Sequence, residues 1–397
     1  MHSRGKCERK MENERKGAGS RLRDASHFRS YDRESSGSFA VTSRGSDRAE
    51  QPLAVNELEL LKPVSRSFYL SIRLLPRTLR EPVALAYLLA RTSDTIADSN
   101  AMPAEKRIEL LDRFARAIAG KDQSIGKALK DLLLSKQDGS QSSSRSRGTK
   151  TLPDLSSGIT EGEKALLESA EKILRALKNL SREDQRDVRE LLAIITRGQR
   201  EDLTRWSGGL AALAHAQELL DYTYLVAGCV GEFWTRVCFR KVQSFTARLE
   251  ADMLELGTNY GRGLQLVNIL RDAGSDLRAG RCYFPEDELR AVDLSASDLL
   301  DAPAAFLPIY SRWIAEARAG LDAGLEYAIA INPARVRVAT VLPAMIGVRT
   351  LSLLEESGLD ALRTRVKVPR SEVRGMIAST TITLASQSRL RRARAKL

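Results

Sequence analysis

A helical run that ends in two aspartates constrains this sequence more than any other feature. Apolar residues recur at spacings of three and four at Leu264, Val267 and Leu270, which is typical of one face of an α-helix. Asp272 and Asp276 follow four residues apart, so a continuing helix places both carboxylates on one face. Like charges at this spacing repel by roughly 0.2–0.5 kcal/mol on an exposed helix. The pair therefore indicates a Mg²⁺ site that bridges carboxylates to substrate phosphates.

A second acidic pair occurs far upstream, again after an apolar helical run. Asp94 and Asp98 are four residues apart, and Arg91 precedes them as Arg271 precedes the downstream pair. One such pair alone is a weak signal, because two acids at this spacing occur on many solvent-exposed helix faces. Two pairs, each beside an arginine, predict a site that binds metal-bridged diphosphates from two sides.

The composition is that of an all-α protein, and the length leaves room for one large domain or two small ones. Of the 397 residues, 43% are hydrophobic, and few segments alternate polar and apolar residues with period two. The net charge of +12 favours an anionic partner, namely nucleic acid, anionic lipid or a polyanionic substrate, or else a cationic surface that aids solubility. The charge alone would also suit a non-catalytic basic helical binding protein. No basic segment is interleaved with aromatic residues, so we do not expect nucleic-acid binding.

Cysteine and histidine usage excludes several classes of enzyme. The four cysteines form no C-x-x-C pair, which argues against a disulfide framework and for a reducing compartment. Two of the three histidines, His2 and His27, lie in the polar N-terminal segment. A histidine metal site or a Ser-His-Asp triad is therefore nearly excluded. The chemistry must rest on carboxylates, arginine, lysine, tyrosine and a metal ion.

Three segments are too polar to belong to a hydrophobic core. They are a disordered basic tail at residues 1–50, a flexible insertion at 136–158 and a basic C-terminal tail at 381–397. One folded domain would occupy residues 51–380. Its longest apolar run, residues 338–348, is shorter than a membrane span and is bracketed by Arg337 and Arg349. We expect a cytoplasmic monomer, with peripheral contact to the inner face of the membrane as the alternative for the basic end of the chain.

Helical periodicity and helix breakers predict most of the helices. Pro76 ends one segment, and Pro103 and Gly120 bound another. The expected helices lie at about residues 55–62, 80–98, 103–120, 160–178, 182–206 and 211–227, as a pair within 296–327, at 336–356, and from 371 onward.

Four motifs occur in an order that resembles one enzyme family. They are S-R-S-F at residues 65–68, Y-x-x-x-R-x-x-D-x-x-x-D from Tyr87 to Asp98, Y-x-x-x-V-A-G-x-V-G from Tyr222 to Gly231, and Q-x-x-N-I-x-R-D-x-x-x-D from Gln265 to Asp276. Together they resemble the squalene/phytoene synthase family, the head-to-head prenyl transferases, over about residues 56–375. Four motifs in order are far more specific than any one of them.

The resemblance implies an all-α, single-domain fold of the isoprenoid-synthase type around a central cavity. The two aspartate pairs, Asp94 with Asp98 and Asp272 with Asp276, would face each other and each hold a diphosphate through Mg²⁺. Tyr222 matches the tyrosine proposed to assist ionisation or deprotonation in the first half-reaction. Residues that match substrate-binding positions are Ser65, Arg66, Ser67, Phe68, Tyr87, Arg91, Gln265, Asn268 and Arg271. Residues expected near a nicotinamide cofactor are Asn268, Arg271, Lys367 and Arg370.

The reaction implied by the resemblance joins two molecules of farnesyl diphosphate into presqualene diphosphate, which NADPH then reduces to squalene. Mg²⁺ and arginine would neutralise the leaving diphosphate, and an apolar pocket with aromatic faces would shield the carbocation from water. This chemistry needs neither histidine nor a nucleophilic cysteine, which agrees with the composition. We expect a bacterial type of enzyme, because the C-terminal membrane anchor of eukaryotic squalene synthases is not seen in the sequence.

Two departures from the squalene synthase pattern leave the product open. Ala97 and Ser275 stand where eukaryotic squalene synthases have acidic residues, and R-A-G-R-C-Y-F-P-E-D-E-L resembles the continuation found in phytoene synthases. The alternatives are a non-reductive phytoene or dehydrosqualene synthase and a presqualene diphosphate synthase.

Overall fold

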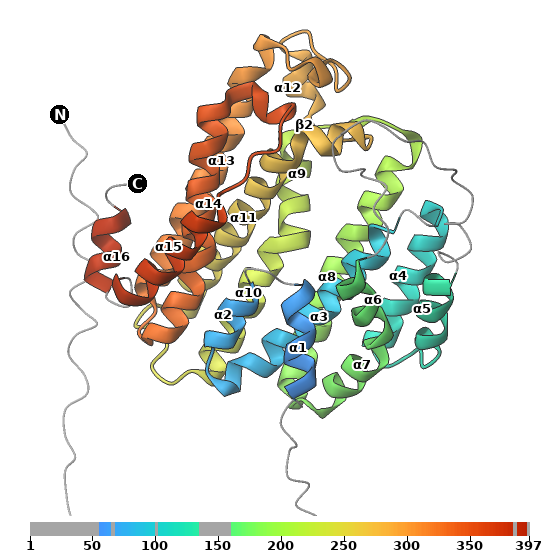
Figure 1. The fold of residues 1–397 in the computed structure, drawn as a ribbon, viewed down its shortest axis with the longest axis vertical. Coiled ribbons are helices and arrows are strands. Elements are labelled where there is room, and N and C mark those ends of the chain that lie inside the picture. The colour runs from blue at the N-terminus through green and yellow to red at the C-terminus, as the bar shows by residue number, and fades with distance from the viewer. Residues whose placement is uncertain (1–54, 65–67, 100–101, 135–159, 384–386, 395–397) are drawn as a thin grey trace, which may run out of the picture. The chain divides into compact units, whose positions relative to one another are not determined.

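Helices make up nearly all of the fold, which confirms the all-α class. The computed structural model describes residues 55–64, 68–99, 102–134, 160–383 and 387–394, and Figure 1 shows their arrangement. The expected tail at 1–50 and the whole of the expected insertion at 136–158 lie outside the described residues. The helices are α1 (Val55–Val64), α2 (Phe68–Leu74), α3 (Arg77–Ala97), α4 (Ala104–Ile118), α5 (Ile125–Leu134), α6 (Glu161–Glu168), α7 (Ala170–Asn179), α8 (Arg182–Arg205), α9 (Ala216–Thr223), α10 (Cys229–Lys241), α11 (Glu250–Arg278), α12 (Glu286–Arg290), α13 (Leu307–Ala330), α14 (Ala334–Ser357), α15 (Arg370–Thr383) and α16 (Gln387–Arg394).

Two short strands interrupt the expected helical pattern. β1 (Ala211–Leu213) pairs in parallel with β2 (Arg281–Pro285). The helix expected over residues 211–227 therefore begins as a strand and continues as α9 and a π-helical segment, η3 (Tyr224–Gly228). Helical periodicity alone could not predict this pairing, because the partner strand lies far along the chain.

Two other expected helices are shorter than predicted. The helix expected over residues 160–178 is broken at Ser169, which ends α6 and precedes α7. Within residues 296–327, the first expected helix is replaced by two 3-10 turns, η4 (Asp298–Asp301) and η5 (Ala304–Phe306). Pro303 separates these two turns, and proline cannot continue a regular helix from the preceding residues.

Helix α11 lies at the centre of the described domain. Its 29 residues pack against α10, α13 and α14, and Figure 1 shows it between α10 and α13. A Cβ on Gly231 of α10 would lie 1.9 Å from the backbone oxygen of Gly257, and one on Gly263 would lie 2.7 Å from the backbone of Gly320 in α13. The helices therefore meet backbone to backbone, and this close packing fixes the position of the aspartates near the C-terminal end of α11.

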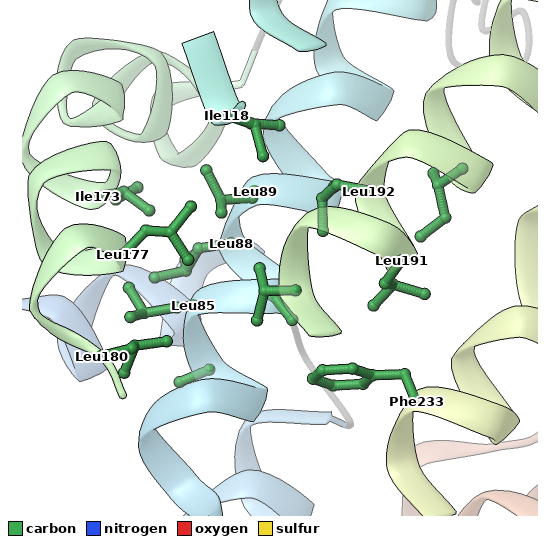
Figure 2. Close-up of a cluster of buried hydrophobic side chains, with 14 of the residues drawn as sticks. Leu85, Leu88, Leu89, Ile118, Ile173, Leu177, Leu180, Leu191, Leu192 and Phe233 are labelled. Atoms are coloured by element: carbon green, nitrogen blue, oxygen red, sulfur yellow. The ribbon is translucent and has the colours of Figure 1, made fainter. Parts of the chain in front are cut away.

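Two groups of buried apolar side chains form the core. One joins α3 mainly to α4, α7, α8 and α10. Figure 2 shows Leu85 and Leu89 of α3 beside Leu177 of α7 and Leu192 of α8. The other group surrounds α11 and includes side chains of α13, α14 and β2. Each helix that carries an aspartate pair is thus anchored in its own part of the core.

The segment expected to be a basic C-terminal tail is partly helical and packed. Helix α16 lies against α13. Its Leu390 is fully buried, and the Gln387 side chain donates to the carbonyl of Ile331 at 3.2 Å. This part of the tail is ordered because one leucine within a basic run finds an apolar surface.

One helix in the described part of the chain, Ala334–Leu362, is long and apolar enough to cross a membrane by length and composition. The apolar run expected from the sequence, residues 338–348, is shorter than this helix because it was bounded by Arg337 and Arg349. The apolar window is 61% buried inside the protein, as in the core helix of a globular domain. A single helix of this kind gives only weak support for a membrane span.

Replacing Gly231 by alanine should destabilise the domain. The added methyl group would clash with a backbone oxygen, which cannot move aside as a flexible side chain can. We expect the free energy of unfolding to fall by about 1–3 kcal/mol in urea denaturation. Gly375→Ala in α15 is the matched control, because nothing lies within 4 Å of its added Cβ. It should stabilise the protein by up to about 1 kcal/mol, and equal stability of the two variants would contradict the close approach of α10 and α11.

Candidate active site

The C-terminal end of α3 carries the first aspartate pair. The helix ends at Ala97, so Asp98 caps it and Asp94 lies one turn earlier. Gln199 of α8 donates its amide to Asp94 Oδ1 at 2.6 Å. Burial, and then the charge of Asp98, raises the pKa of Asp94 to about 6, and burial raises the pKa of Asp98 as well. The pair therefore holds negative charge where burial disfavours it, and a bound cation would stabilise it.

Arg91 and Tyr87 lie one and two turns before this pair on α3. The Arg91 guanidinium pairs with Glu163 of α6 at 2.6 Å and lies 3.8 Å from Asp94. Glu163 was not predicted, because the sequence gives no sign that α6 meets α3. The Tyr87 hydroxyl donates to the carbonyl of Val64 at 3.3 Å, which fixes its ring against α1.

The second aspartate pair lies near the C-terminal end of α11, and arginines contact both carboxylates. Arg271 donates to both oxygens of Asp272, with Nη2 2.5 Å from Oδ2. Arg365 lies 3.3 Å from the other oxygen of Asp272. Arg281 of β2 pairs with Asp276 at 2.7 Å. Burial still raises the pKa of Asp276, although Arg281 opposes the rise.

Arg281 links the two aspartate pairs. Burial raises the pKa of Asp98 and of Asp276, and the charge of Arg281 opposes the rise at both. Arg281 therefore lies within electrostatic reach of an aspartate from each pair. The guanidinium that β2 supplies therefore pairs with Asp276 and also acts electrostatically on Asp98 of the first motif.

An apolar cavity of about 370 Å³ lies beside the first pair. Side chains of α2, α3, α8, α10, α11, α13 and α14 form its walls, and its volume falls within the range typical of ligand pockets. Asp94, Gln265 and Asn268 are among its few polar lining residues. The other three aspartates do not line it. The aromatic lining residues are Tyr87, Phe233, Trp234, Tyr260 and Tyr327.

Tyr222 belongs to a polar aromatic cluster that the sequence analysis did not predict. Its ring stacks on Tyr283 of β2 with centroids 4.9 Å apart, and the two hydroxyl oxygens are 3.3 Å apart. Tyr283 donates to Asp202 of α8 at 2.8 Å, and the indole N–H of Trp206 donates to the same carboxylate at 3.1 Å. A signal was present, since Tyr283 lies within the segment that resembles phytoene synthases, two residues after Arg281.

The residues expected near a nicotinamide cofactor lie partly on an extended segment between η6 (Gly358–Leu362) and α15. Lys367 is exposed there and Arg370 is exposed at the start of α15, while Val366 is buried in the core. Arg365, which the sequence analysis did not single out, is the residue of this segment that contacts the second aspartate pair. The predicted residues that lie outside the described part of the chain are Ser65, Arg66, Ser67 and the side chain of Phe68.

The donor groups of the two pairs suit Mg²⁺ together with a bound diphosphate. Carboxylate oxygens are ligands that Mg²⁺ prefers, and Mg²⁺ usually binds one or two carboxylates while water and phosphate complete its coordination. Among the described residues, no three His, Cys, Asp or Glu side chains form a group that could hold a metal ion. Each pair would therefore supply at most two ligands, and the diphosphate and water would supply the rest.

Known proteins with similar folds and sequences include squalene synthases. The structure described as TcSQS with the ligand E5700 has a TM-score of 0.65 and 22% sequence identity, covering 86% of this chain and 91% of that chain. Squalene synthase of Saccharomyces cerevisiae is 28% identical over 243 residues, or 61% of this chain and 47% of that protein. Presqualene diphosphate synthase of Rhodopseudomonas palustris is 28% identical over 308 residues, or 77% of this chain and 89% of that protein.

These comparisons differ in what they establish. The structural likeness shows the isoprenoid-synthase type of fold, and this chain spans about half the length of the yeast relative. The family model for squalene/phytoene synthase matches residues 61–372, which include both aspartate pairs and Tyr222. Because this match covers most of the chain, the protein belongs to the squalene/phytoene synthase family.

Proposed function

We propose that the protein is a Mg²⁺-dependent prenyl transferase that condenses two molecules of farnesyl diphosphate head to head into presqualene diphosphate and reduces this product to squalene with NADPH. The observation that carries the proposal is that Arg281 pairs with Asp276 and also acts electrostatically on Asp98, together with an apolar cavity that Asp94 lines. Members of the squalene/phytoene synthase family are prenyl transferases, and the family match covers both helices.

The four aspartates would hold the diphosphates. Asp94 and Asp98 would bind one through Mg²⁺, and Asp272 and Asp276 the other. Bound Mg²⁺ would neutralise charge that develops on the leaving diphosphate. Arg271 is already placed beside the second pair, and its guanidinium would turn from Asp272 to the diphosphate as the metal binds.

The cavity would bind the prenyl chains and protect the carbocation. Its lining is mostly aliphatic and aromatic, so it excludes water that would otherwise capture the cation. Aromatic faces can stabilise a cation by about 0.5–2 kcal/mol each. Tyr87 lines the cavity two turns before the first aspartate pair, where its ring would face the reacting carbons.

The reductive step is supported by the basic segment before α15. Lys367 and Arg370 are exposed, and the contact between Arg365 and Asp272 holds this segment beside the second aspartate pair. Phosphate groups of NADPH would bind there, with Asn268 and Arg271 nearer to the reacting carbons. The second candidate is a presqualene diphosphate synthase, because the relative of that name is matched over 89% of its length.

The product formed from farnesyl diphosphate tests this proposal. With Mg²⁺ alone, the purified protein should accumulate presqualene diphosphate, and adding NADPH should convert it to squalene. Gas chromatography with mass spectrometry after dephosphorylation distinguishes these products. Presqualene diphosphate as the end product with NADPH present would favour the second candidate. Dehydrosqualene formed regardless of NADPH, or turnover of the twenty-carbon diphosphate only, would contradict both.

Neutralising one aspartate of each pair should abolish most of the activity. Asp94→Asn and Asp276→Asn each remove a metal ligand, so we expect kcat/KM to fall by at least about 100-fold. Glu255→Gln is the matched control for Asp276, because Glu255 lies on the exposed face of the same helix. It should leave kcat/KM within about twofold, since surface charge contributes little at a distance. Similar losses in the control and the aspartate variants would argue against the site.

Activity should also fall as the pH drops through about 6, because protonated Asp94 cannot bind metal. The hydrogen bond from Gln199 favours the ionised form, so Gln199→Leu should raise the pKa of Asp94 further and move the acid limb of the pH profile to higher pH. Gln217→Leu is the control, because it removes a similar bond to Asp221 on the surface of α9. The midpoint at limiting Mg²⁺ should move in Gln199→Leu only, and an unchanged midpoint would contradict the role of Asp94.

A further inference from the structure

Tyr222, Tyr283 and Asp202 form a hydrogen-bonded chain whose direction can be worked out. The Tyr222 and Tyr283 hydroxyl oxygens are 3.3 Å apart, and the Tyr283 hydroxyl lies 2.8 Å from Asp202 Oδ2. The indole N–H of Trp206 lies 3.1 Å from Asp202 Oδ1. The four residues come from α8, the turn after it, α9 and β2, so the chain depends on the tertiary fold.

The chemistry of Asp202 determines which groups donate the hydrogen bonds that it accepts. An ionised carboxylate only accepts hydrogen bonds, and an indole N–H only donates, so Trp206 and Tyr283 are both donors to Asp202. Tyr283 has one hydroxyl proton, which it donates to Asp202. With that proton used, the contact between the two tyrosines has Tyr222 as its donor, and Tyr222 also has a hydrogen-bonding interaction with Asp202. Tyr222 therefore has no proton left for a substrate and offers lone pairs alone.

The position of Tyr222 suits contact with the substrate. Its electrostatic interaction with Asp276 places it near the second aspartate pair. It also lies four residues before Val226, which lines the cavity. The stack with Tyr283 and the edge contact between Tyr283 and Trp206, with centroids 5.6 Å apart, hold the rings in place. Tyr222 thus lies within electrostatic reach of the second aspartate pair, on the same stretch of chain as a residue that lines the cavity.

We propose that Asp202 is a positioning residue that makes Tyr222 a proton acceptor, and that Asp202 receives through Tyr283 the proton lost as presqualene diphosphate forms. This inference rests on the proposed condensation. It also decides between the two roles open to Tyr222, because a tyrosine without a free proton can assist deprotonation but cannot protonate the leaving diphosphate.

The proposed step conserves atoms and charge. A C–H bond of the joined prenyl cation breaks, and its electron pair forms the new carbon–carbon bond of the product. The proton goes to the Tyr222 oxygen, the former Tyr222 proton goes to Tyr283, and the former Tyr283 proton goes to Asp202. Both tyrosines end neutral, the cation becomes neutral, and the Asp202 carboxylate becomes a carboxylic acid.

The surroundings favour such a relay over ionised tyrosines. Burial, and then the charge of Asp202, raises the pKa of Tyr222 well above its usual value, and burial does the same for Tyr283. Burial also raises the pKa of Asp202, which makes it a better proton acceptor than an exposed carboxylate. Bonds from Tyr283 and Trp206, and the nearby charge of Arg281, oppose that rise and support the ionised form before the reaction.

A double-mutant cycle tests the relay. Tyr222→Phe, Tyr283→Phe and Asp202→Asn should each lower kcat for condensation by at least about 100-fold, as expected when proton transfer is lost. Their KM for farnesyl diphosphate should stay within about threefold of the wild type. Adding Asp202→Asn to Tyr222→Phe should cause less than about a further threefold loss, because groups that act as a unit are not additive. The kcat of Asp202→Glu should be at least about tenfold higher than that of Asp202→Asn.

The outcomes distinguish this inference from the proposed function. If the wild type forms no condensation product, the proposed function fails. If the wild type is active but the losses in the double mutant multiply, or KM rises as much as kcat falls, the relay is contradicted. Tyr283→Phe removes one hydroxyl and keeps the ring stack, so it tests the relay even if Asp202→Asn does not fold. Full kcat in Tyr283→Phe would overturn the proposal.

Discussion

The burial of negative charge is the constraint on which the rest of this site depends. A carboxylate taken out of water is costly unless it is paired or hydrogen-bonded. A hydrogen bond from the amide of Gln199 to Asp94, and ion pairs of arginines with Asp272 and Asp276, offset part of this free energy. Burial nevertheless leaves the pKa of Asp94 and Asp276 raised. The protein side chains thus compensate the charge only in part, which is what a site that recruits a divalent cation requires.

Strand β2 connects the acidic centre to the tyrosine cluster. Residues two apart on a strand share one face, and β2 uses this spacing at Arg281 and Tyr283. Arg281 pairs with Asp276, and Tyr283 lies between Tyr222 and Asp202. A short strand pair in an otherwise helical domain is therefore well placed to keep the proposed diphosphate site and the proposed proton acceptor at a fixed distance from each other.

Local spacing made the helices and their carboxylates predictable. The apolar residues before Asp272 recur with helical spacing, and the same pattern precedes Asp94. Recognising either pattern needs only residues that are close together in the sequence. The partners of these residues were not predictable in this way. Gln199, Glu163 and Arg281 reach the aspartates and Arg91 from other elements, and no periodicity in the sequence reports such contacts.

The same limit applies to the cavity and the basic segment. Gln265 and Asn268 line the cavity, and they precede Asp272 on α11 by seven and four residues, a spacing that the sequence itself shows. The aromatic lining comes from α3, α10, α11 and α13, and their meeting depends on glycines that let α10 and α13 approach α11. Arg365 was missed because its approach to Asp272 depends on how the chain returns after α14.

Diffraction from crystals grown with Mn²⁺ and an unreactive thio analogue of farnesyl diphosphate would test the central claim most directly. Anomalous scattering locates Mn²⁺ without reference to activity. We predict metal ions at both aspartate pairs, each bridging carboxylates to a diphosphate, with both prenyl chains in the one apolar cavity. Metal ions bound away from the aspartates, or prenyl chains in separate places on the surface, would contradict the account.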